Sequence, residues 1–130
     1  GAIKVLAERF AAAPSPMSHI VIEHFHGACT RVGVTDTACT LRTPGFSVVL
    51  ISQWSDPKDN ESGINWCRET FAAMKPFLGT TRYMNYLAKD EADDVAATVY
   101  GPNYARLQQL KAKYDPDNVF HANVNIRPKR

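Results

Sequence analysis

The apolar run from Phe46 to Trp54 constrains the fold of this chain more than any other segment. It is rich in Val and Ile, and Pro44-Gly45 precedes it as a turn signal. So short an apolar run is typical of a strand, because β-branched residues suit a pleated backbone and buried helices are longer. The run therefore predicts a strand that is buried on both faces.

A helix is predicted directly after this strand. Ser55-Asp56-Pro57 supplies candidate capping residues and a proline suited to the first helical turn. Apolar side chains then recur at spacings of three and four, until Pro76 and Gly79 end the pattern. The stripe consists of Ile64, Cys67, Phe71, Met74 and Leu78. It is the clearest helical period in the chain.

The flanking segments extend this pattern to an α+β fold. We predict helices over 3–12 and 90–99, and another that follows the break at Gly101-Pro102-Asn103 and runs to about Tyr114. We also predict a strand over 18–25, a short irregular strand pair over 30–41, and extended segments at 81–87 and 119–126. This order predicts an antiparallel sheet with helices packed on one face, plus a helical C-terminal lobe.

Length and charge narrow the classes of function. The 130 residues suit one domain of ordinary size. The net charge of +2, without a basic stripe interleaved with aromatic residues, argues against a nucleic-acid partner. No apolar run approaches the ~20 residues that cross a bilayer, and no signal peptide is recognisable. We therefore expect neither nucleic acid nor a membrane as a partner.

Cysteines and histidines complete the inventory of reactive side chains. The chain has three cysteines, Cys29, Cys39 and Cys67. Their odd number and the lack of a C-x-x-C pair predict reduced thiols in a cytoplasmic protein. His24 and His26 would share a strand face near His19 and Glu23, but a metal site needs a third convergent ligand. We expect no metal site, and no motif indicates a hydrolase.

Two short segments carry polar side chains that an extended backbone would aim together. In Tyr83-Met84-Asn85-Tyr86, Tyr83 and Asn85 would share one face, and Met84 and Tyr86 the other. Further on, Asn123 and Asn125 would also share a face. Paired amides donate and accept hydrogen bonds at once, which suits the edge of a heteroaromatic ring or a polyol. Alternatively, they satisfy backbone groups of their own loops.

The stretch from Tyr83 to Pro128 resembles the C-terminal signature of the berberine bridge enzyme-like flavoproteins. The family pattern Y-x-N-Y appears as Tyr83, Asn85 and Tyr86. The pattern Y-G-x-N-Y-x-R-L-x-x-L-K-x-K-Y-D-P-x-N-x-F runs from Tyr100 to Phe120, and N-x-N-I-x-P appears as Asn123, Asn125, Ile126 and Pro128. Upstream the agreement is looser, resting on Gly27-Ala28, Ala38, Arg42, the strand ending at Trp54, and Trp66-Cys67-Arg68.

This resemblance implies a C-terminal part of a FAD-dependent oxidoreductase. The flavin would take a hydride from an alcohol, sugar or amine-type small molecule and usually be reoxidised by dioxygen. Tyr86 corresponds to the general base of several family members, although a free phenol, with a pKa near ~10, needs surroundings that lower it. Asn85, Asn123, Asn125 and Tyr83 are the expected cofactor contacts.

The resemblance also implies that residues 1–130 are a single C-terminal fragment. Residues 1–80 would belong to the substrate domain, and 81–130 form the signature segment. No Gly-rich phosphate loop precedes a helix, so the FAD-binding domain of the parent protein is an expected partner. We expect the isolated chain to be inactive. Leu41 stands where many members have His, and the 46–54 strand has no carboxylate, so a mechanism using a Glu from that strand is not expected.

A function of another class remains open. The chain would then be a non-catalytic α+β module, in which Tyr86 is a packed aromatic with a satisfied hydroxyl. Apolar surface left uncovered by a missing partner domain favours self-association, so a homodimer is the expected assembly.

Overall fold

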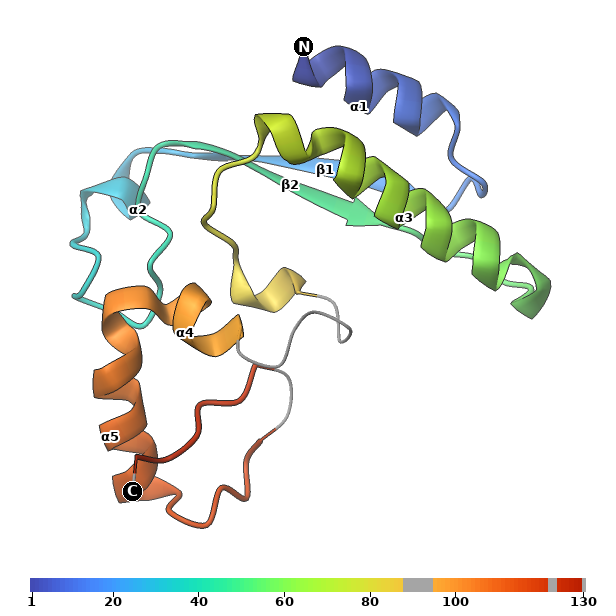
Figure 1. The fold of residues 1–130 in the computed structure, drawn as a ribbon. Coiled ribbons are helices and arrows are strands. Elements are labelled where there is room, and N and C mark those ends of the chain that lie inside the picture. Colours follow the sequence, from blue (N-terminus) through green and yellow to red (C-terminus); the bar gives the residue numbers. More distant parts are fainter. Residues whose placement is uncertain (88–94, 122–123, 130) are drawn as a thin grey trace. The chain divides into compact units, whose positions relative to one another are not determined.

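The computed structural model describes residues 1–87, 95–121 and 124–129 (Figure 1). Its regular elements are α1 (Ala2–Ala11), β1 (His19–Phe25), α2 (Ala28–Arg31), β2 (Gly45–Ile51), α3 (Asn60–Met74), α4 (Val95–Tyr100) and α5 (Tyr104–Tyr114). Short 3-10 turns are η1 (Pro57–Asp59), η2 (Lys75–Phe77), η3 (Met84–Tyr86) and η4 (Gly101–Asn103). The chain forms two compact units, residues 1–24 with 45–80, and residues 25–44 with 81–130.

In the first unit, β1 and β2 pair as a two-stranded antiparallel sheet. Helix α3 packs against β2 and also against α1, as Figure 1 shows. In the second unit, the regular elements that the structure describes from residue 81 onward are all helical. The predicted α+β class, with an antiparallel sheet and a helical C-terminal lobe, is therefore confirmed.

Strand β2 confirms the strand expected from the apolar run, but the expected burial on both faces is wrong. No residue of β2 is fully buried, and Phe46 is 69% exposed. The reason is the size of the sheet. Among the described residues it has only two strands, so β2 has one unpaired edge and its side chains lack neighbours on that side.

The contact between α1 and α3 depends on polar groups. The indole Nε1 of Trp66 donates to the carbonyl oxygen of Arg9 at 2.7 Å, at the end of α1. The guanidinium Nε of Arg9 donates to the Thr70 hydroxyl at 3.0 Å, and this hydroxyl donates to the Trp66 carbonyl at 2.6 Å. Thr70 is fully buried. The three residues therefore satisfy one another where the helices meet.

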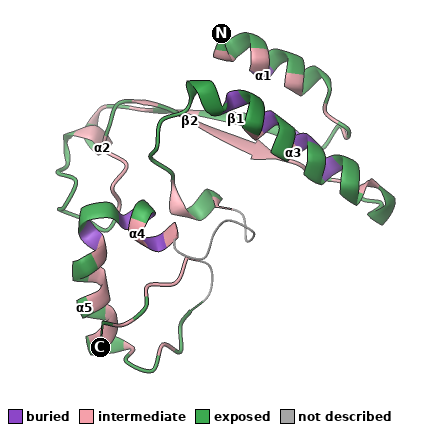
Figure 2. Cartoon of the chain, viewed as in Figure 1, coloured by how far each residue is buried: buried purple, intermediate pink, exposed green. Residues whose placement is uncertain are grey.

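The face of α3 that is buried in the structure differs from the apolar stripe predicted from the sequence. The buried residues of α3 are Gly63, Trp66, Thr70 and Met74, and Figure 2 shows buried positions recurring along one side of the helix. Ile64, from the stripe, is 42% exposed. The buried face is shifted because α1 covers Trp66 and Thr70, which carry the polar contacts.

The predicted capping signal caps η1, the 3-10 turn that leads directly into α3. The Asp56 carboxylate accepts a hydrogen bond from the backbone N–H of Lys58 at 3.0 Å, and Pro57 occupies the first turn of η1. Gly63 then allows a close approach to the end of the strand region, since a Cβ at this position would lie 2.3 Å from Cε3 of Trp54. The Trp54 indole is anchored by its Nε1, which donates to Oδ1 of Asn60 at 2.6 Å.

In the second unit, residues 30–41 do not form the expected strand pair. They contain the end of α2 followed by turns. The Asp36 carboxylate accepts from the backbone N–H of Gly33 at 2.9 Å, and Arg42 donates to the Cys29 carbonyl at 3.0 Å. These side chains occupy backbone groups that a strand ladder would use, so local polar bonding replaces the sheet.

The same loop is held by the helices of the second unit. Thr40 donates from its hydroxyl to the carbonyl of Val99 at 2.8 Å, and the buried amide of Asn103 donates to the carbonyl of Val34 at 2.8 Å. Helix α4 contributes the core residues Ala96, Val99 and Tyr100. The acidic start expected for this helix, at 90–94, lies outside the described residues.

Candidate functional site

The predicted site segment around Tyr83 forms a turn and not the expected extended chain. The backbone N–H of Tyr86 donates to the carbonyl of Tyr83 at 3.0 Å, which closes η3. The two aromatic rings therefore meet edge to face, with centroids 5.1 Å apart, instead of pointing to opposite faces. The side-chain amide of Asn85 donates to the Tyr83 hydroxyl at 2.8 Å. The turn thus gathers Tyr83, Asn85 and Tyr86 into one cluster.

This cluster lies at the surface of the second unit. Tyr86 is 47% exposed, Asn85 is exposed and Tyr83 is half-buried. A half-exposed phenol beside an amide and a second phenol can donate and accept hydrogen bonds toward a bound molecule. The arrangement therefore suits the polar part of a ligand-binding wall.

A shallow hollow opens beside the cluster. It is lined by Ala38, Cys39, Thr40, Leu41, Arg82, Tyr83, Met84 and Val99, and its volume is about 10 Å³. That is roughly the room needed by one water molecule, whereas small-molecule pockets measure about 300–1,000 Å³. The hollow by itself is therefore too small to hold a small-molecule ligand.

Asn125 carries a second feature of the predicted site. The side chain is half-buried, and its Oδ1 is buried without a hydrogen-bond partner among the described residues. A buried acceptor left unsatisfied costs about 1–3 kcal/mol, so it suits an N–H or O–H donor brought by another molecule or domain. Asn123, the other member of the amide pair, lies outside the described residues.

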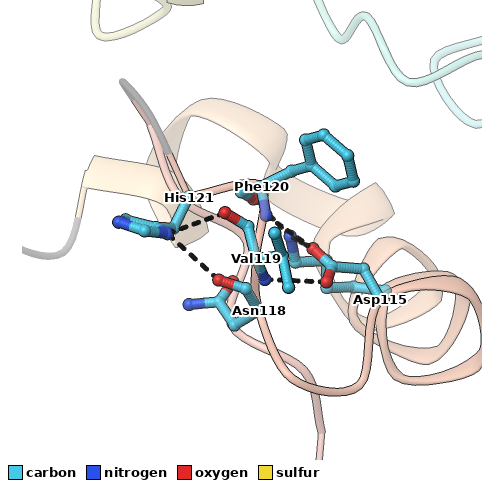
Figure 3. Close-up of polar contacts among 6 residues, drawn as sticks. Asp115, Asn118, Val119, Phe120 and His121 are labelled. Atoms are coloured by element: carbon cyan, nitrogen blue, oxygen red, sulfur yellow. Dashed lines mark hydrogen bonds and ion pairs between the residues drawn. The ribbon is translucent and has the colours of Figure 1, made fainter.

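The structure adds a polar cluster that was not among the predicted site residues. The Asp115 carboxylate accepts from the backbone N–H groups of Val119 at 2.8 Å and Phe120 at 3.1 Å (Figure 3). The ammonium of Lys111 donates to the same carboxylate and to the Phe120 carbonyl. We call Lys111 and Asp115 the tail clamp. Both residues belong to the family-like pattern, which is the signal that marks them.

Two residues beside the tail clamp complete the turn after α5. Asn118 adopts a left-handed backbone with a φ of 55°, a conformation that asparagine tolerates better than most residues. The His121 ring is turned away from Asp115, and its Nδ1 lies 3.1 Å from the Asn118 carbonyl and 3.0 Å from that of Val119 (Figure 3). The chain therefore leaves α5 along a defined path.

Several described side chains have pKa values displaced by their surroundings; among them, the hydrogen bond from Lys58 lowers the pKa of Asp56. The hydrogen bond from Lys111 holds the pKa of Asp115 below its ordinary value of 3.8. Burial raises the pKa of Tyr100 and that of the Cys67 thiol. A lowered carboxylate pKa keeps the tail clamp ionised at neutral pH, so its charge-assisted hydrogen bonds persist there.

The histidines of β1 do not assemble a metal site. The ring of His24 stacks on Phe46 with centroids 4.6 Å apart. Over residues 1–87, 95–121 and 124–129, no three His, Cys, Asp or Glu side chains lie where they could hold a metal ion. Within those same ranges, no helix is both long enough and apolar enough to span a bilayer.

A known family matches the C-terminal part of this chain. Residues 82–127, which contain the Tyr83 cluster, Asn125 and the tail clamp, match the family described as berberine and berberine like. An uncharacterized FAD-linked oxidoreductase of Bacillus subtilis is 32% identical over 104 residues, which cover 80% of this chain and 23% of that protein.

Solved structures extend the likeness to the fold. A berberine bridge enzyme-like protein of Physcomitrella patens superposes with a TM-score of 0.82 at 19% identity, covering 99% of this chain and 27% of that one. A glycopeptide hexose oxidase, solved with teicoplanin, superposes with a TM-score of 0.81 at 25% identity, covering 98% and 29%. The chain thus spans about a quarter of the length of these relatives. It belongs to the berberine bridge enzyme-like family of FAD-linked oxidoreductases.

Proposed function

We propose that this chain provides the substrate-side wall of the active site in a FAD-dependent oxidase. The complete protein would transfer a hydride from an alcohol, sugar or amine-type small molecule to the flavin. The observation that carries the proposal is the cluster of Tyr83, Asn85 and Tyr86, which presents two phenols and an amide on one exposed turn. The hollow beside it is too small to hold such a substrate alone, so a second wall is needed.

The residues present fit a flavin. The buried Oδ1 of Asn125 lacks a donor within the described chain, and the edge of an isoalloxazine ring offers an N–H. We assign Asn125, Asn123, Asn85 and Tyr83 as contacts to the cofactor. When bound, FAD supplies the acceptor for the hydride. The protein side chains orient the substrate and handle the proton.

We assign Tyr86 as the general base. For an alcohol substrate, the phenolate oxygen of Tyr86 would take the hydroxyl proton while the hydride leaves the carbon, and the C–O bond becomes a carbonyl. The proton then resides on Tyr86, and both electrons leave with the hydride. The half-exposed position of the ring supports this role, because a base must reach the substrate hydroxyl.

The proposal implies partners for this chain. The FAD-binding domain of the parent protein would supply the pyrophosphate site and the opposite wall, so the chain of 130 residues is expected to be inactive by itself. We treat it as a C-terminal fragment in which residues 81–130 form the signature segment. All three cysteines are free, which supports a reducing compartment such as the cytoplasm.

Replacing Tyr86 with phenylalanine in the complete protein tests the proposal. Tyr86→Phe should lower the rate of flavin reduction by substrate at least 100-fold, since general-base catalysis contributes about 10²–10⁴-fold. Flavin content, measured by visible absorbance, should not change. Tyr114→Phe is the matched control, because Tyr114 is 74% exposed and outside the cluster. Unchanged flavin reduction in Tyr86→Phe would remove this residue from the mechanism, and a colourless wild-type protein would refute the whole proposal.

The exposed apolar side chains of the first unit favour a second candidate function, self-association as a non-catalytic module. Ile3 and Phe10 on α1 are 84% and 56% exposed, and Phe46 on β2 is 69% exposed. Apolar surface of this kind tends to be covered by a partner. Light scattering of the purified chain distinguishes the candidates, since a dimer disrupted by Phe46→Ser supports self-association and a monomer at high concentration contradicts it.

A further inference from the structure

The segment that follows α5 is attached to that helix at two points. At its start, the tail clamp engages the backbone of Val119 and Phe120. At its other end, the backbone N–H of Lys129 donates to the carbonyl of Gln108, also on α5, at 3.5 Å. Asn125 lies between these attachments in the sequence. Both attachments use backbone groups, so they place the main chain that carries Asn125.

The first attachment is the stronger one on chemical grounds. Lys111 and Asp115 are one helical turn apart, and their side chains are only 13% and 11% exposed. The carboxylate accepts two backbone N–H groups, while the ammonium donates to the Phe120 carbonyl. The backbone N–H and the carbonyl of Phe120 are thus both hydrogen-bonded to the same ion pair. Hydrogen bonds to ionised groups are about twice as strong as neutral ones, so the pair defines the direction in which the tail leaves the helix.

Apolar packing of the neighbouring side chains does not explain how this segment is held. Val119 and Phe120 are 66% and 82% exposed, although their backbone is held by Asp115. Burial of these side chains therefore contributes little to their placement in this chain. The polar tail clamp is the device that orders this part of the tail.

We propose that Lys111 and Asp115 are positioning residues that hold the tail so that Asn125 is presented to the flavin. This inference rests on the proposed function, because it needs Asn125 to contact the cofactor. It goes further by assigning a role to two residues that are not expected to touch substrate or flavin. Asn125 would keep its buried acceptor without a partner among the described residues because the tail is held in place before the cofactor binds.

The test uses the complete flavin-loaded protein and two pairs of variants. Asp115→Asn removes the charge at nearly constant shape, and Asp117→Asn is its matched control in the same turn, where Asp117 is exposed. Lys111→Gln is the second test variant, with Lys113→Gln as its control on the exposed side of α5. Lys111→Gln carries the test if Asp115→Asn does not fold. Hydrogen exchange over residues 116–127 and the visible spectrum of the flavin are recorded for each.

We expect the amides of Val119 and Phe120 to exchange at least 10-fold faster in both test variants and at the wild-type rate in both controls. Flavin content should stay constant, while the visible flavin bands shift in the same direction as in Asn125→Ala. Flavin reduction by substrate should slow by about as much as in Asn125→Ala.

Each other outcome is decisive. Unchanged exchange in a flavin-loaded test variant shows that Lys111 and Asp115 do not hold the tail, and so overturns the inference. Faster exchange with an unchanged flavin spectrum shows that they hold the tail without positioning Asn125 at the flavin, and this also overturns the inference. A wild-type protein that contains no flavin overturns the proposed function itself, and the inference with it. The two failures are therefore distinguished by the flavin content of the wild type.

Discussion

Substituting Gly63 with alanine tests how closely α3 packs against the residues that follow β2. The new Cβ would lie 2.3 Å from Cε3 and 2.4 Å from Cζ3 of Trp54, and 3.1 Å from Oγ of Ser52. An ordinary contact begins at 3.4 Å, so the ring must move by about 1 Å. The Trp54 indole also donates to Asn60 at 2.6 Å, and this movement would weaken that hydrogen bond.

The expected change in the free energy of unfolding is the sum of two destabilising effects and one stabilising effect. Overpacking of this kind destabilises a protein by about 1–3 kcal/mol, and losing the hydrogen bond adds about 0.5–1.5 kcal/mol. Alanine is favoured over glycine inside a helix by about 1 kcal/mol, which offsets part of the loss. Gly63→Ala should therefore lower the free energy of unfolding by about 2 kcal/mol, within roughly 0.5–3.5 kcal/mol.

Urea unfolding followed by tryptophan fluorescence measures this change. Asn65→Ala is the control, because residue 65 lies on the exposed side of the same helix and gains helix propensity without a new contact. Its expected effect is a gain of about 0.5 kcal/mol or less. In a Trp54→Ala background, Gly63→Ala should become stabilising because the clash is gone. A Gly63→Ala protein as stable as the wild type, with unchanged Trp emission, would refute the packing argument.

Three further predictions concern single side chains. Thr70→Val should lower the free energy of unfolding by about 1–3 kcal/mol, because Arg9 loses its buried acceptor; an unchanged urea midpoint would contradict this. The pKa of Asp115 is lowered, so its stabilisation is complete above pH 3.8 and is lost as the pH falls through the lowered value. The stability gap to Asp115→Asn should therefore close in acid, and a widening gap would be inconsistent with the ion pair. Because burial raises the pKa of Cys67 from 9.0, native Cys67 should resist iodoacetamide at pH 8 and react after unfolding, as mass spectrometry can check.

The sequence indicated which residues form the candidate cluster better than it indicated how they are arranged. Tyr83, Asn85 and Tyr86 were selected from spacing and resemblance, and the structure does bring them together. The expected alternation of faces was wrong, because one backbone hydrogen bond from Tyr86 to Tyr83 turns the chain. Alternation assumes an extended backbone, and a segment of a few residues does not reveal by itself whether it closes a turn.

The tail clamp shows a different limit of sequence reasoning. In the sequence, Lys111 and Asp115 were visible only as part of the family-like signature. Its role depends on which backbone groups the carboxylate reaches, and these are Val119 and Phe120. The sequence contains the acceptor, Asp115, but it does not show the path of the chain that brings the two backbone N–H donors to its carboxylate.

The sequence by itself determined the features that arise from neighbouring residues. The strand at 45–51, the cap at Asp56 and the signature of the family all depend on short spacings. Only the tertiary structure decided which face of α3 is buried, because Arg9 meets Thr70 across 61 positions. It also decided that β2 is not buried on both faces, since burial depends on how many strands surround it. Periodicity and capping are local, whereas burial and polar pairing depend on residues that only the folded chain brings into contact.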